Sequence, residues 1–176
     1  RQMCIRDRDV SIIKTDGKSK YIGILDEYFE YPKKIYKNLT SLRDKIKSSK
    51  DLKKQRKQIA SIEKEITIFH AKAVNQVIKK SGENVDFVGF HGQTIFHNAK
   101  VKITKQLGDG KLLSKLTKKN VIYDFRKKDL KNGGEGAPLT PIFHKLLQKK
   151  FKIKQVSFFN IGGIVNKTTI LDDGSI

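Results

Sequence analysis

The sequence of 176 residues predicts an α/β fold built around a mixed β-sheet. Two observations carry this prediction: a β-hairpin opens the chain, and short apolar runs then alternate with stretches of helical periodicity. A third observation concerns function, because polar residues and glycines follow directly after several of the apolar runs. Open α/β sheets bind ligands at the carboxyl ends of their parallel strands, so we expect a ligand site there.

The first predicted element is a β-hairpin over residues 10–31, with Asp16-Gly17 at its turn and Pro32 closing its second strand. Residues 33–57 are dominated by lysine with sparse apolar residues, which favours an amphipathic surface helix. Residues 59–80 are predicted to form a better-defined helix. Apolar side chains recur there at three-to-four spacing and make one buried stripe.

Three apolar runs in the rest of the chain are predicted strands, at residues 85–90, 121–125 and 155–163. Helices are expected near residues 112–116 and 141–149, and the segment between the first of these helices and residue 90 is treated as a variable loop. The last strand leads into a glycine pair and a returning strand, which is the pattern of a hairpin.

Composition and cysteine usage narrow the class of protein. Hydrophobic residues make up 37% of the chain, and no apolar run approaches the roughly 18–20 residues that span a bilayer, so no membrane partner is expected. No signal peptide is recognisable. The single cysteine, Cys4, excludes an internal disulfide framework, so the predicted location is the cytoplasm.

The formal net charge of +20 has two interpretations. A nucleic-acid-binding module would use clustered Lys and Arg to release counterions from phosphates. The basic residues here are spread along the chain and most are lysine, with no aromatic-interleaved basic motif or zinc-finger spacing. We therefore favour solvated lysine-rich helix faces, and keep nucleic-acid binding as the less favoured alternative.

Four polar clusters are candidates for a functional site: residues 91–94 (HGQT), 106–109 (QLGD), 124–139 and 160–166 (NIGGIVN). His91 is either a general base or substrate-binding group, or a residue that caps a strand end. Arg126, with Asp124 and Asp129 nearby, is either a fork for an anion or part of an ion pair that fixes the loop. The sequence leaves both pairs of alternatives open.

The glycines are the second feature of these clusters. Residues 133–138 permit close backbone approach to a sugar or a phosphate, or form only a tight crossover. Gly162-Gly163 after a strand can aim backbone N–H groups at phosphate oxygens, although neither the Walker loop nor the dinucleotide fingerprint is present. No metal-ligand spacing occurs, so the remaining histidines are interpreted as structural: His70, His97 and His144.

Four blocks in this order, DFVGFHGQTIFH, QLGD, DFRKKDLKNGGEGAPLTPIFH and FFNIGGIVN, resemble the signature blocks of the anhydro-N-acetylmuramic acid kinase family. The resemblance runs from about residue 9 to residue 176. It implies an actin-like (ribonuclease H-like) lobe at residues 9–140 that lacks its first strand, and a truncated second lobe that begins with a hairpin at residues 141–176. Residues 1–8 resemble a translated adapter sequence and are expected to be non-native.

The resemblance also implies an activity. Family members use ATP and Mg2+ to phosphorylate the 6-oxygen of 1,6-anhydro-N-acetylmuramic acid while water opens the anhydro ring at carbon 1. The product, N-acetylmuramic acid 6-phosphate, enters cell-wall recycling. The implied partners are thus ATP and an amino sugar, with a homodimer considered for the full-length protein. The alternative is another sugar kinase or ATPase of the same superfamily.

Carried over residue by residue, the resemblance implies two groups of ligand-binding residues. The ATP phosphates would be bound by Asp9, Asn160, Gly162, Gly163 and Asn166, and the sugar by His91, Gln93, Arg126, Asp129, Gly136 and Pro138. The family's general-base aspartate stands in a Gly-Pro-Gly-Asn block that is expected beyond Ile176. Asp172 and Asp173 lack that context, so no catalytic residue is assigned and this chain alone is expected to be inactive.

Overall fold

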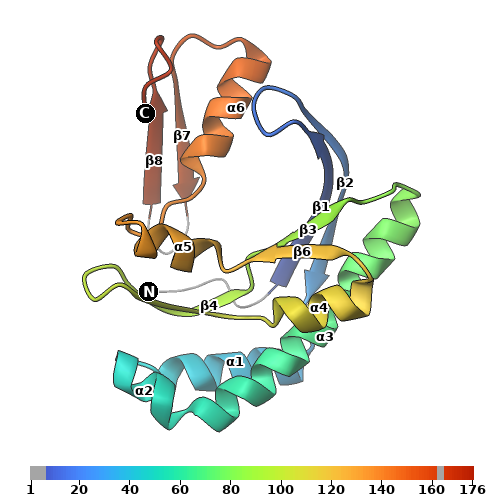
Figure 1. The fold of residues 1–176 in the computed structure, drawn as a ribbon, viewed down its shortest axis with the longest axis vertical. Coiled ribbons are helices and arrows are strands. Elements are labelled where there is room, and N and C mark those ends of the chain that lie inside the picture. Colours follow the sequence, from blue (N-terminus) through green and yellow to red (C-terminus); the bar gives the residue numbers. More distant parts are fainter. Residues whose placement is uncertain (1–6, 162–164) are drawn as a thin grey trace.

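The computed structural model describes residues 7–161 and 165–176 (Figure 1). The strands are β1 (Asp7–Thr15), β2 (Tyr21–Glu30), β3 (Phe87–Phe90), β4 (Gln93–Asn98), β5 (Ile103–Leu107), β6 (Asn120–Tyr123), β7 (Val156–Ile161) and β8 (Val165–Ile170). The helices are α1 (Lys33–Lys45), α2 (Ser49–Lys54), α3 (Arg56–Ser81), α4 (Gly110–Thr117), α5 (Phe125–Lys131) and α6 (Pro141–Phe151). The predicted α/β class is confirmed.

The predicted opening hairpin is present as β1 and β2, which pair antiparallel from Asp7 opposite Glu30 to Thr15 opposite Tyr21. Its turn is held by Asp16, whose carboxylate accepts the backbone N–H groups of residues 18, 19 and 20. These bonds hold the pKa of Asp16 well below its ordinary value. Residues 7 and 8, which the sequence interpretation set apart as non-native, lie in β1.

The lysine-rich segment forms two helices instead of one. α1 buries Ile35, Leu39 and Leu42 and ends at Lys45. Ser48 and Asp51 then form a capping box, in which the Asp51 carboxylate accepts the Ser48 N–H at 2.8 Å. This box starts α2 as a separate helix, and the lysine pattern concealed it.

The long helix α3 extends the predicted helix at residues 59–80 and ends at Gly82, which adopts a left-handed conformation with φ 67°. This helix contacts α1 and β5, and also α4, β1 and β2. The largest core cluster therefore contains Tyr31, Ile35, Leu39, Leu42, Ile46, Ile59, Ile62, Ile66, Ile95 and Leu107.

The described strands form four two-stranded ladders instead of one continuous mixed sheet. β3 and β6 are parallel, and β1–β2, β4–β5 and β7–β8 are antiparallel. The β4–β5 hairpin occupies the segment interpreted as a variable loop. The loop interpretation was wrong. Three inward-facing positions of the hairpin are polar and buried, namely Gln93, Thr104 and Gln106, so the usual alternation of apolar and polar residues is lost.

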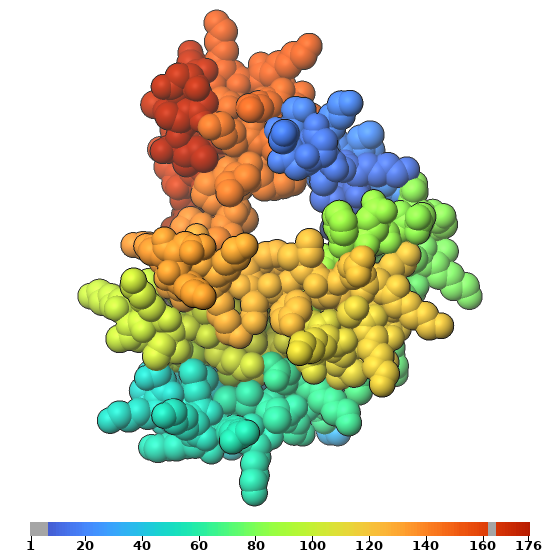
Figure 2. Space-filling model, in the orientation of Figure 1, coloured from blue at the N-terminus to red at the C-terminus, as the bar shows by residue number. Residues whose placement is uncertain are grey.

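The last part of the chain folds as α6 against the β7–β8 hairpin, as predicted, with Leu146 and Ile170 buried. It touches the opening hairpin where the rings of Tyr21 and Phe143 meet edge to face, 5.3 Å between centroids. Figure 2 shows an opening in the molecular surface between this upper part, the β1–β2 hairpin and the body below. No helix in the described part of the chain is long and apolar enough to cross a membrane.

Candidate functional site

Three strand ends meet at one hollow. β3 and β6 run parallel with Phe90 opposite Tyr123, so His91 and Asp124 emerge side by side. β5 ends at Leu107, next to Gly108. The hollow is lined by Phe90, His91, Gly92, Gln106, Leu107, Gly108, Tyr123 and Asp124, which pack closely enough to leave no room for a water molecule. The structure therefore brings the HGQT, QLGD and DFR segments together at the predicted edge.

Two glycines allow this convergence. Gly92 has φ 68°, and a Cβ there would lie 2.3 Å from the Leu107 carbonyl oxygen. Gly108 has φ 144°, and a Cβ there would lie 2.5 Å from the Phe90 ring. Neither position has room for a side chain, so these glycines permit the close packing of the strand ends.

His91 has both ring nitrogens engaged. Arg126 Nε donates to His91 Nε2 at 3.0 Å, so the ring proton of the neutral form is on Nδ1 and is donated to the Gly92 carbonyl at 3.0 Å. Partial burial of the ring lowers the pKa of His91 although the residue as a whole is exposed, and the charge of Arg126 lowers it further. This arrangement favours a neutral, positioned imidazole.

Arg126 and Asp129 hold the glycine turn. Arg126 Nη1 donates to the Gly136 carbonyl at 2.7 Å, and the Asp129 carboxylate accepts the Gly136 N–H at 2.7 Å. A Cβ on Gly134 would lie 2.2 Å from Asp129 Oδ2, so the carboxylate fills the space that this glycine leaves. Helix α5, which the sequence did not reveal, places the two side chains three positions apart on one face.

The other predicted sugar residues make different contacts. Gln93 is 3% exposed, and its side-chain oxygen accepts a hydrogen bond from the Arg8 guanidinium. Arg8 also donates to the Tyr31 hydroxyl at 2.9 Å, which ties Gln93 to the core. Gly136 is buried, with φ 72°, and Pro138 is exposed after a cis peptide bond.

The predicted phosphate residues come from two other elements. Asp9 is an exposed residue of β1, opposite Tyr28. Since neighbouring strand residues point to opposite faces and Arg8 reaches Gln93, Asp9 points away from Gln93. Asn160 and Asn166 face each other at the end of the β7–β8 hairpin. Gly162 and Gly163 lie outside the described residues.

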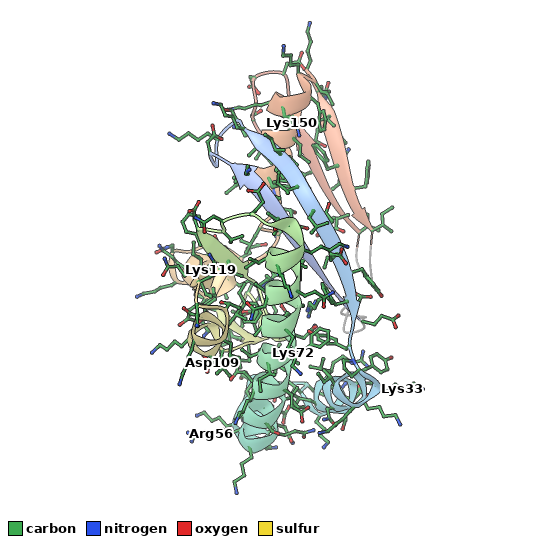
Figure 3. The ribbon with its side chains drawn as sticks, turned by 90° about the vertical axis from the view of Figure 1, so that its right-hand side faces the viewer. Lys33, Arg56, Lys72, Asp109, Lys119 and Lys150 are labelled. Atoms are coloured by element: carbon green, nitrogen blue, oxygen red, sulfur yellow. The ribbon has the colours of Figure 1, made fainter. Side chains whose placement is uncertain are left out.

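Two residues of α3 that sequence reasoning missed support the QLGD segment. The Glu63 carboxylate accepts the Gly108 N–H at 3.1 Å and the Lys105 ammonium at 2.7 Å. The Thr67 hydroxyl accepts the Asp109 N–H at 3.0 Å. Figure 3 shows Asp109 beside α3. The available signal was a pair of polar residues at i, i+4 next to the apolar stripe.

Parallel strand ends, glycine bends and a positioned imidazole define an α/β protein with a candidate small-molecule site at its strand ends. The family model described as anhydro-N-acetylmuramic acid kinase matches residues 5–176. The chain therefore belongs to the anhydro-N-acetylmuramic acid kinase family.

Individual relatives agree with this family. The chain is 58% identical over 164 residues to the anhydro-N-acetylmuramic acid kinase of Pelagibacter ubique (strain HTCC1062). The aligned region covers 93% of this chain and 44% of that protein. It is 36% identical to the enzyme of the same name from Rhizobium etli, over 96% of this chain and 47% of that protein. For Brucella canis the identity is 32%, with the same coverage. The chain thus spans less than half the length of these relatives.

Proposed function

We propose that the whole protein is an ATP-dependent kinase that converts 1,6-anhydro-N-acetylmuramic acid to N-acetylmuramic acid 6-phosphate, with hydrolytic opening of the anhydro ring, in cell-wall recycling. The observation that carries this proposal is the family match over residues 5–176. The geometry supports it, because three of the four blocks that resemble the family meet around one hollow.

The sugar is proposed to bind on the side of the hollow where His91, Arg126, Asp129 and Gly136 form one hydrogen-bonded network. Gln93 and Pro138 are proposed to flank it. Phosphoryl transfer depends on placing the acceptor oxygen and excluding other water, and a network with locked rotamers serves that purpose. His91 acts here by positioning, since its Nε2 lone pair is occupied by Arg126.

The ATP phosphates are proposed to lie against Asp9, Asn160, Gly162, Gly163 and Asn166. ATP would bring Mg2+, which binds such sites through one or two carboxylates together with phosphate oxygens and water. This mode suits the described part of the chain, where no group of three His, Cys, Asp or Glu side chains gathers.

At the level of the fold, we propose an actin-like (ribonuclease H-like) first lobe at residues 9–140 and the beginning of a second lobe at residues 141–176. The opening between α6 with its hairpin and the body below supports a division near residue 140 (Figure 2). A cytoplasmic location and a homodimeric whole protein belong to the same proposal.

A coupled assay that follows ADP release tests the proposal on the complete gene product. We expect turnover with 1,6-anhydro-N-acetylmuramic acid and none with simple hexoses. Turnover with hexoses alone would point to another sugar kinase of the superfamily. Absence of turnover with every sugar would contradict the kinase proposal.

A further inference from the structure

His97 is the second histidine of the HGQTIFH segment, and no contact described above involves it. It lies on β4 and pairs in register with Thr104 of β5. Its ring is partly buried and reaches the glycine turn that follows α5. His97 therefore connects the β4–β5 hairpin to the turn that is proposed to bind the sugar.

The ring of His97 packs against Gly136. A Cβ built on Gly136 would lie 3.1 Å from His97 Cε1 and 3.0 Å from Leu130 Cγ, so these two side chains occupy the space beside the glycine. Contacts of this length leave little room for a methyl group, and the φ of 72° at Gly136 is in the left-handed region. The position of Gly136 is thus set by the side chains around it as well as by its own backbone angle.

His97 differs in origin from the other side chains that hold Gly136. Arg126, Asp129 and Leu130 all belong to α5, so their contacts fix the turn relative to that helix. His97 comes from β4, whose partner strand β5 ends at the strand-end hollow. Its ring is therefore a direct contact between the turn and the body of the molecule.

Thr104 sets the orientation of the His97 ring. Its hydroxyl oxygen lies 3.2 Å from His97 Nδ1, and Thr104 itself is 8% exposed. The hydroxyl can accept a proton from Nδ1 while it donates to the Phe96 carbonyl at 3.3 Å, or it can donate to Nδ1. The contact exists in either tautomer of His97, so it holds the ring against Gly136 whichever nitrogen carries the proton.

We propose that His97 is a positioning residue of the sugar site and that it acts through Gly136. Its ring holds the turn where Arg126 binds the Gly136 carbonyl and Asp129 binds the Gly136 N–H. That this turn binds the sugar rests on the proposed function. Small displacements of groups that place a substrate reduce the reaction rate strongly, so loss of the ring should impair the use of the sugar more than the use of ATP.

Three substitutions in the complete gene product separate the ring of His97 from its polar nitrogen. His97→Ala removes both, His97→Asn keeps a polar group near the position of Nδ1, and His97→Phe keeps a ring beside Gly136 without the hydrogen bond to Thr104. Phe96→Ala is the matched control. Phe96 is the preceding residue of β4, and because neighbouring strand residues point to opposite faces, its ring packs against the largest core cluster.

Two kinds of measurement decide the outcome. Hydrogen exchange followed by mass spectrometry reports on the segment that contains the Gly136 N–H, and calorimetry with steady-state turnover reports on the affinity and KM for each substrate. We expect His97→Ala and His97→Asn to speed exchange in this segment about 10-fold and to raise the sugar KM about 10-fold, with the ATP KM changed less than about twofold. His97→Phe should restore most of both losses.

Phe96→Ala should lower the Tm, because it leaves a cavity in the core, but should keep the sugar KM and the exchange of the Gly136 segment within about twofold of the unmodified protein. Unchanged exchange in His97→Ala, faster exchange with unchanged sugar affinity, or equal losses of sugar affinity in His97→Ala and Phe96→Ala would each overturn the proposal. Rescue by His97→Asn but not by His97→Phe would overturn the role of the ring.

The same measurements keep this proposal apart from the proposed function. Sugar binding by the unmodified protein without turnover would contradict the kinase function alone, and the affinities of the His97 variants would still decide. Absence of sugar binding by the unmodified protein would contradict the proposed substrate, while the exchange rates would still show whether His97 holds the Gly136 turn.

Discussion

Individual polar residues around the hollow mostly hold one another in place. Arg126 bridges His91 and the Gly136 carbonyl, and Asp129 binds the other side of the same peptide segment. Of the two readings that the sequence left open for Arg126, these contacts favour the one in which it fixes the loop, although through hydrogen bonds to His91 and the backbone instead of a carboxylate. In the proposed kinase, a residue that fixes the binding groups would still affect catalysis, because small displacements reduce phosphoryl transfer.

Arg126→Lys is the first test at this scale. Lysine keeps the positive charge but cannot reach His91 and Gly136 with the two arms of a planar fork. We expect kcat/KM for the sugar to fall about 10- to 100-fold, as for the loss of one or two charge-assisted hydrogen bonds. The control is Lys128→Ala on the same helix, because Lys128 is exposed and its loss should matter less than about twofold. Similar losses in the two variants would argue against a specific role of Arg126.

His70 carries a second prediction, on pH. Its ring is buried against Phe69, Phe90 and Tyr31, with Nδ1 2.6 Å from the Ile66 carbonyl oxygen, and burial lowers the pKa of His70 to about 4 from 6.5. Between these values the unfolded chain binds a proton that the folded chain does not. The free energy of unfolding should therefore fall as the pH drops through this window, by at most about 1.4 kcal/mol per pH unit.

Urea denaturation at several pH values between 7 and 4 measures this effect. His70→Gln should be less stable than the original protein at pH 7, because it loses packing in the core, but its stability should depend less on pH within the window. Parallel pH profiles for the two proteins would show that His70 does not titrate as described.

At the scale of elements, α3 supports the site from below through Glu63 and Thr67. Thr67 is fully buried, and its hydroxyl donates to the Glu63 carbonyl at 2.6 Å while it accepts the Asp109 N–H. Thr67→Val keeps the shape and leaves the Asp109 N–H without this partner, so we expect a loss of about 1–3 kcal/mol in the free energy of unfolding. Glu65→Ala on the same helix is the control, since its ion pair with Lys34 and its hydrogen bond from Asn38 are partly exposed and should together contribute less than about 1 kcal/mol. Chemical denaturation of both variants checks the difference, and a Thr67→Val variant as stable as Glu65→Ala would contradict it.

Elements with clear apolar periodicity could be predicted from the sequence, and the others could not. The β1–β2 hairpin, α3, β3, α4, β6, α6 and the β7–β8 hairpin follow such patterns or a turn signal. The β4–β5 hairpin was missed because Gln93, Thr104 and Gln106 face inward. Helix α5 was missed because it has only seven residues with one buried apolar side chain, Leu130. Because helix α5 was missed, the sequence identified Arg126 and Asp129 as candidates but did not reveal that both bind the backbone of Gly136.

For the molecule as a whole, the distribution of charge bears on the nucleic-acid alternative. Lys33, Lys72 and Lys150 lie on α1, α3 and α6, and Lys119 lies in the turn before β6, so these four are spread along the molecule in Figure 3. A dispersed arrangement of this kind favours solubility over binding at one face. The strand-end hollow and the family match both favour small-molecule chemistry instead.

The last prediction concerns the activity of these 176 residues by themselves. Within the described residues each candidate base at the hollow is already engaged: His91 by Arg126 and Asp124 by Lys127, while Asp129 beside it holds the Gly136 N–H. A missing general base typically lowers a rate 10²- to 10⁴-fold. We therefore expect the isolated chain to turn over 1,6-anhydro-N-acetylmuramic acid at least about a hundredfold more slowly than the complete gene product in the same coupled assay at equal concentration. Circular dichroism of the isolated chain is the control for folding. A folded chain with turnover within tenfold of the complete product would show that a base among these residues, with His91 the first to examine, performs the chemistry.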